Sequence, residues 1–88
     1  MSKKLSKFKL KYMSMLMQLK NELLQRHTDK ADRIEYIADV LMHKLYALKI
    51  HSIADYLHTV YLATKEFAEF SKMMPPQEEV EELLKEED

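Results

Sequence analysis

Apolar side chains recur every three or four residues along most of the chain, which is the spacing of one face of an α-helix. This spacing predicts three helices, over residues 14–26, 31–49 and 53–73. Ser14 is a candidate N-cap for the first helix, and Pro75-Pro76 end the third because proline cannot continue helical hydrogen bonding. We therefore expect a single, mainly helical domain over residues 1–74.

Residues 7–12 carry two patterns at once. Lysine alternates there with a large apolar side chain, and strict alternation predicts a β-strand. The segment also fits a helix, because these apolar residues fall on one helical face: Leu5, Phe8, Tyr12, Met15, Leu19 and Leu23. Met13 and Met17 widen that face, which indicates burial on more than one side, by the same chain or by a second copy.

The formal net charge of −1 conceals three segments of different charge. Residues 1–26, which begin with a basic arm at 1–6, sum to +6; residues 27–74 sum to −1 and residues 75–88 to −6. A basic end and an acidic tail suggest a polyanionic partner. We expect the tail at 75–88 to be disordered or to form a short, weakly docked helix; alternatively, it folds over the basic end.

Composition excludes several kinds of site. The chain has no cysteine, hence no disulfide and no thiolate metal site, and it has no glycine, hence no Gly-rich phosphate loop. The Asp39/His43 and Asp55/His58 pairs fall on polar helix faces, so we expect surface pairs there and no metal. We also expect no catalytic residue, no enzymatic activity, no cofactor, no membrane partner and a cytoplasmic location.

Two motifs are similar to those of a known family. One is the alternation of Phe8, Leu10 and Tyr12 with Lys7, Lys9 and Lys11. The other is the run Asp-Arg-Ile-Glu-Tyr-Ile at residues 32–37, which aliphatic residues follow. Over residues 7–49, this order of basic alternating segment, helix, polar loop and helix resembles the ribbon-helix-helix transcriptional repressors of the Arc and MetJ type.

The resemblance implies a mainly α-helical ribbon-helix-helix homodimer with an appended third helix. Two copies would pair their strands over a shared core of Phe8, Leu10, Tyr12, Ile34, Ile37 and Leu41. Lys7, Lys9 and Lys11 would enter the major groove of DNA, while Thr28 and Lys30 would help the second helix to contact phosphate. The expected function is dimeric DNA binding and transcriptional repression. An acidic tail folded over the basic end would compete with DNA for the lysines.

If residues 7–12 are helical, the expected fold and function are different. The first helix would then be continuous, and the chain would be an all-α three-helix bundle that binds or inhibits a partner protein without enzymatic activity. Methionines such as Met13, Met15 and Met17 are typical both of a core and of an adaptable binding surface. Three tyrosines fall off the main apolar stripes and fit an oligomer interface: Tyr36, Tyr46 and Tyr61.

Overall fold

The computed structural model describes residues 3–86, and its regular elements are all helical. The α-helices are α1 (Lys3–Arg26), α2 (Ala31–Tyr46), α3 (Ile53–Glu66) and α4 (Gln77–Leu84). Short 3-10 helices join them: η1 (Thr28–Lys30), η2 (Ile50–Ser52) and η3 (Ala68–Met73). The predicted β-ribbon is therefore wrong for the described residues, and an all-helical bundle with a continuous first helix fits our alternative instead.

Residues 7–12 lie inside α1, without a break at Ser14. The physical reason is the length over which each pattern holds. Strand alternation covers only six residues, whereas one helical face buries side chains along most of α1: Leu5, Phe8, Tyr12, Leu16, Leu19 and Leu23. A strand would have turned Leu10 toward the same core, but this side chain is 69% exposed.

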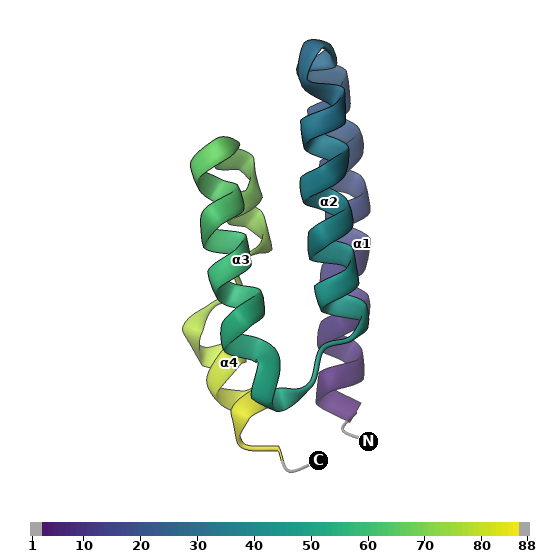
Figure 1. Ribbon diagram of the computed structural model, residues 1–88. Coiled ribbons are helices and arrows are strands. Elements are labelled where there is room, and N and C mark those ends of the chain that lie inside the picture. Colours follow the sequence, from purple (N-terminus) through teal and green to yellow (C-terminus); the bar gives the residue numbers. More distant parts are fainter. Residues whose placement is uncertain (1–2, 87–88) are drawn as a thin grey trace.

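The helices form an elongated bundle of 43 × 19 × 17 Å (Figure 1). α1 and α2 run antiparallel as a hairpin, and α3 packs along one side of it. η3 then turns back along α3 and reaches α1, while α4 lies at the end of the bundle where α1 begins. The beginning of α1 and the end of α4 are therefore close together, which the contact between Lys4 and Glu82 confirms.

A single hydrophobic core joins these elements. α1 and α2 contribute most of it, and α2 buries Ile34, Ile37, Ala38, Leu41 and Leu45. Aromatic rings extend the core toward α3, since the Phe8 and Tyr56 ring centroids are 6.2 Å apart in an edge-on arrangement. The Tyr56 hydroxyl donates to the Met73 carbonyl at 3.0 Å, so its polar atom is satisfied inside the core.

The turns are built without glycine. Among residues 3–86 no backbone φ is positive, and the chain instead reverses through 3-10 helices and extended residues. The predicted helix at 53–73 is interrupted at Phe67, whose extended backbone (φ −137°, ψ 110°) starts the return into η3. That return places Phe70 and Met73, both fully buried, against the rest of the core. The helix predicted over residues 31–49 ends at Tyr46. The Ser52 hydroxyl hydrogen-bonds to the backbone of Lys49 and does not cap α3.

Candidate protein-binding surfaces

The three lysines expected to contact DNA do not share a face. Lys9 is partly buried, and its ammonium donates to the carbonyl of Leu48, two residues beyond α2, at 3.4 Å. Lys11 points to another side of α1 and pairs with Glu79 at 2.8 Å. Lys7 is exposed near Lys11. A helix spreads these alternate positions around its axis, so the lysine row that a ribbon needs does not exist here.

The two residues expected to contact phosphate lie in η1. Thr28 is exposed, and the Lys30 ammonium lies 5.9 Å from the centre of the Phe67 ring. Both line a hollow of about 610 Å³ that is open to solvent. Carboxylates of Asp29, Asp32 and Glu66 share this hollow, so its charge is mixed.

The six residues expected in a shared dimer core have separate positions in the structure. Five are buried within one chain: Phe8, Tyr12, Ile34, Ile37 and Leu41. The sixth, Leu10, lies on the surface. It belongs to a second apolar stripe of α1, on the side that faces α2 but away from α3.

This second stripe forms what we call the hairpin surface, made of Leu10, Met13, Met17 and Leu24 on α1 and Met42 and Tyr46 on α2. Leu10, Met17 and Tyr46 are 69%, 60% and 73% exposed, and the others are partly buried against the core. On α1, Leu10, Met17 and Leu24 follow one another at seven-residue spacing, which is the spacing of a helix–helix seam. Lys20 interrupts this stripe between Met17 and Leu24, whereas Leu10, Met13 and Tyr46 gather around one hollow. Exposed apolar side chains gathered in this way are typical of an interaction site.

The hairpin surface is open along its length. Within residues 3–86, no salt bridge crosses from α1 to α2. A hollow of about 510 Å³ lies between the two helices, with Leu10, Met13 and Tyr46 in its walls and Lys9 and Lys49 at its rim. Toward the other end of α2, Glu35 and Asp39 are charged neighbours, and Lys20 of α1 lies on the same stripe between Met17 and Leu24. The surface therefore has a basic end and an end of mixed charge.

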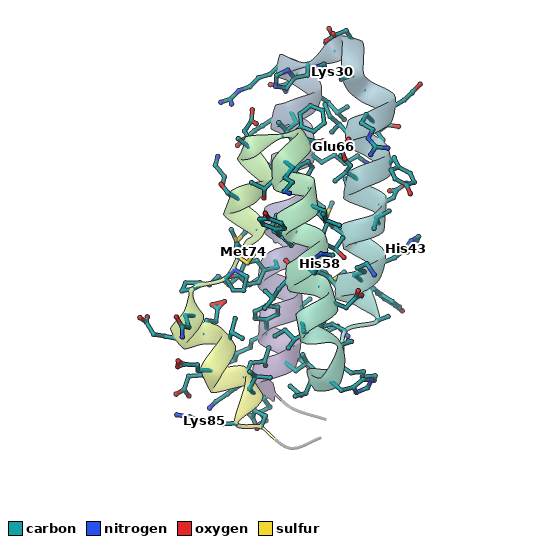
Figure 2. The ribbon with its side chains drawn as sticks, turned by 60° about the vertical axis from the view of Figure 1, so that its left-hand side comes forward. Lys30, His43, His58, Glu66, Met74 and Lys85 are labelled. Atoms are coloured by element: carbon teal, nitrogen blue, oxygen red, sulfur yellow. The ribbon has the colours of Figure 1, made fainter. Side chains whose placement is uncertain are left out.

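The groove between α2 and α3 also exposes apolar side chains, but ion pairs cross it. Arg33 of α2 holds the Glu66 carboxylate through two hydrogen bonds of 2.7 and 2.8 Å, close to the label of Glu66 in Figure 2. Lys44 pairs with Asp55 at 2.6 Å further along. The Arg33 guanidinium also covers the Tyr36 ring at 5.2 Å. These contacts hold the Arg33 pKa above and the Glu66 pKa below their ordinary values, chiefly through their mutual hydrogen bonds.

A second candidate surface lies where α4 meets the basic part of α1 (Figure 2). Leu83 is 2% exposed and anchors α4, while Val80 is partly buried beside the core. Glu79 accepts hydrogen bonds from Lys11 at 2.8 Å and from the Tyr12 hydroxyl at 2.6 Å. Lys4 reaches Glu82 at 3.2 Å. We call this set of contacts the α4 clasp.

The contacts of the α4 clasp change the pKa values of Tyr12, Glu79 and Glu82. Burial of the Tyr12 hydroxyl and its hydrogen bond to Glu79 both raise the Tyr12 pKa. Partial burial acts to raise the Glu79 pKa, but hydrogen bonds from Lys11 and Tyr12 and the charge of Lys11 outweigh it, so the pKa lies below its ordinary value. Hydrogen bonds from Lys4 and Lys85 lower the Glu82 pKa as well. Both carboxylates are therefore more stable as anions when α4 is docked.

We expect α4 to detach in acid before the rest of the bundle unfolds. A lowered carboxylate pKa stabilises docking above the ordinary value of 4.5, and that contribution is lost as the pH falls through the folded-state pKa. Hydrogen-exchange protection factors measured by NMR should fall in Gln77–Leu84 below about pH 4.5, while those of α3 persist. Glu79→Gln should remove most of this pH dependence, and Glu81→Gln, at an exposed position, should leave it unchanged. Protection of α4 that stays constant down to about pH 3 would contradict the assignment.

The described residues offer no metal site and no membrane-spanning helix. No group of three or more potential metal-ligating side chains occurs among residues 3–86, and His43 points away from the bundle (Figure 2). Asp55 is engaged by Lys44. No helix among the described residues is both long enough and apolar enough to cross a membrane.

Comparisons with known proteins add no family. No family model, no curated protein and no solved structure matches the chain. The ribbon-helix-helix resemblance thus receives neither support nor contradiction from other proteins, although the ribbon that it implies is absent from residues 3–86.

Part of the hairpin surface was predicted from the sequence, since Leu10 was expected at a dimer interface, Met13 and Met17 fitted either a core or a binding surface, and Tyr46 fitted an oligomer interface. Leu24 and Met42 were not assigned to any interface. The signal that would have found the surface is the seven-residue spacing of Leu10, Met17 and Leu24, which runs beside the core stripe. The α4 clasp was indicated in the sequence only by the opposite charges of the two chain ends, which suggested that the acidic tail could fold over the basic end.

Proposed function

We propose that this protein is a non-enzymatic interaction protein whose hairpin surface binds a second copy of the same chain. The observation that supports this proposal best is the apolar seam of Leu10, Met17 and Leu24, which continues onto Met42 and Tyr46 and which no other element of the described chain covers. A cytoplasmic location stays part of the proposal. A DNA-reading ribbon has no place in it, because residues 7–12 are helical.

A second copy fits this surface when the two hairpins lie antiparallel. Met17 is midway between Leu10 and Leu24, so a two-fold axis beside Met17 would set each Leu10 next to Leu24 of the other copy. The same axis would bring Lys9 and Lys49 of one copy toward Glu35 and Asp39 of the other, with Lys20 one turn from Met17. The arrangement rests chiefly on the sequence spacing, and the pairing of Lys9 and Lys49 with these two carboxylates is compatible with it.

Energetics also favour self-association. An 88-residue chain buries only a modest core, so covering exposed leucine, methionine and tyrosine adds useful stability. Methionine side chains adapt to a symmetric partner because they are flexible and polarizable. Two antiparallel hairpins packed along such a seam make a four-helix arrangement, which is a common way to bury a second helix face.

Met17→Glu is expected to abolish self-association. At a two-fold axis this substitution places two carboxylates against each other in an apolar surface, so the dimer dissociation constant should rise at least about 100-fold. Sedimentation equilibrium over a range of concentrations measures the constant directly. Leu62→Glu is the matched control, because Leu62 is 47% exposed on α3, outside the hairpin surface, and its replacement should leave the constant unchanged.

Two results would overturn the proposal. One is a wild-type protein that remains monomeric at about 1 mM, since a surface that binds its own copy must associate at such a concentration. The other is a dimer that Leu62→Glu weakens as much as Met17→Glu does. Circular dichroism of each variant checks that the helical bundle is intact.

A further inference from the structure

α4 is held to the bundle by few side chains. It has eight residues, which is too short for a stable helix in water without docking. Leu83 is its one fully buried anchor among the described residues, and its ion pairs with Lys4 and Lys11 are about half exposed on the lysine side. The preceding Met74 and Pro76 are extended, so the backbone of α4 does not continue from η3. Docking of α4 therefore depends on one core side chain, Leu83, on the partly buried Val80 and on a few polar contacts at the surface.

The surface of α1 that α4 covers, which we call the groove, combines apolar and basic side chains. Its floor includes Phe8, and the ring of Tyr12 packs on Phe8 at a centroid distance of 4.6 Å. Its edge is basic, with Lys4, Lys7 and Lys11 along one side of α1. A cleft of about 190 Å³ remains between these lysines and the glutamates of α4, beside Leu83.

We propose that α4 is a displaceable cover and that the groove beneath it binds an acidic amphipathic helix of a partner protein. The partner helix would repeat the pattern of α4, in which a buried leucine is preceded by carboxylates one and four positions earlier, as Glu82 and Glu79 precede Leu83. The carboxylates would pair with Lys4 and Lys11, and the leucine would take the position of Leu83. This inference shares with the proposed function only the role in protein interaction, and it does not depend on self-association.

The groove fits a helix better than it fits a nucleic acid. Glu79 and Glu82 lie one turn apart on α4 and meet lysines two turns apart on α1, so two crossed helices satisfy both pairs. The apolar floor accepts a leucine, for which a phosphate backbone offers no equivalent. Lys7 lines the same cleft and would allow one further carboxylate from a partner. An acidic helix thus uses both the charge and the apolar floor.

The test uses the full chain and a fluorescent peptide with the sequence of residues 75–86. In the wild type, the attached α4 competes at a high effective concentration, so the peptide should bind weakly. Leu83→Glu displaces the attached α4 and should bind the peptide at least about 10-fold more tightly than the wild type does. Fluorescence anisotropy measures both affinities. A peptide in which the leucine equivalent to Leu83 is replaced by glutamate should not bind.

Further variants keep the result interpretable. Glu79→Gln combined with Glu82→Gln loosens α4 without placing a charge near the core, and it should also improve peptide binding. Adding Lys11→Glu to Leu83→Glu should weaken peptide binding again, whereas adding Met17→Glu should leave it unchanged because the hairpin surface lies on another side of α1. The last comparison separates failure of this inference from failure of self-association.

Three outcomes would overturn the inference. The first is a peptide that fails to bind both the Leu83→Glu chain and the double glutamine variant, with helical circular dichroism intact. The second is equal binding to wild type and Leu83→Glu, which would locate the peptide elsewhere. The third is a DNA duplex that binds Leu83→Glu more tightly than the peptide does, which would make the groove a polyanion site.

Discussion

Ser14→Pro is expected to lower the free energy of unfolding by about 3 kcal/mol or more. Ser14 lies in the interior of α1, where proline removes a backbone hydrogen bond and clashes with the preceding turn. Its side chain is exposed, so the loss comes from the backbone alone. A small domain has a total stability of roughly 5–15 kcal/mol, and this single change therefore removes a large share of it.

Urea denaturation followed by circular dichroism measures this effect. Ser14→Ala is the control, and it should be neutral or slightly stabilising because alanine favours a helix interior. In a ribbon-helix-helix protein, position 14 would stand at the start of a helix, where proline is tolerated. Equal stability of Ser14→Pro and Ser14→Ala would therefore show that α1 is not continuous.

Leu16→Ala is expected to destabilise the bundle by about 3 kcal/mol, whereas Leu10→Ala should change its stability by less than about 0.5 kcal/mol. The two leucines belong to the same helix and lose the same atoms. Leu16 is fully buried among core side chains, but Leu10 is 69% exposed. Removing buried methyl groups loses their transfer free energy and leaves a cavity, and neither cost arises at an exposed position.

Both leucine variants should be compared in the Met17→Glu background, so that self-association adds nothing to the difference. Unfolding midpoints and slopes in urea then give the two free energies directly. A strand at residues 7–12 would bury Leu10 in the core. A larger loss for Leu10→Ala than for Leu16→Ala would thus contradict the helical packing described above.

The sequence predicts the core of α1 and α2 well, because both helices bury regular stripes such as Ile34, Ile37 and Leu41. It misleads at residues 7–12, since six alternating residues satisfy strand and helix patterns together and only the length of the helical stripe decides between them. The resemblance to a DNA-binding family rested on that same short stretch. A short sequence pattern predicts secondary structure poorly where packing against the rest of the fold decides which side chains are buried.

Other features depend on contacts between distant residues. Phe67 continues the apolar spacing of α3, so the sequence around it contains no signal that the helix ends there. The chain nevertheless turns at Phe67, and η3 runs back along α3. Leu83 lies in a tail of high negative charge, and its burial depends on a groove formed by residues near the other end of the chain. The hairpin surface is visible in the sequence as a seven-residue spacing, but only the structure shows that it lies outside the core.

The most direct test of the central proposal is disulfide formation through Met17→Cys. The chain has no cysteine of its own, so a single introduced thiol can pair only with the same position of another copy. In the antiparallel arrangement, the two copies of position 17 adjoin the two-fold axis, within the short Cα separation that a disulfide requires. The two copies of position 10 are about 20 Å apart along the helix axes, since fourteen residues at the helical rise separate them.

Under mild oxidation, Met17→Cys should therefore form a covalent dimer that is seen by non-reducing electrophoresis and mass spectrometry. Leu10→Cys alone should form no covalent dimer, while a mixture of Leu10→Cys and Leu24→Cys should give the mixed disulfide. Leu84→Cys, on the exposed side of α4, controls for random collisions. If Met17→Cys crosslinks no faster than Leu84→Cys, the hairpin surface does not bind a second copy in this way.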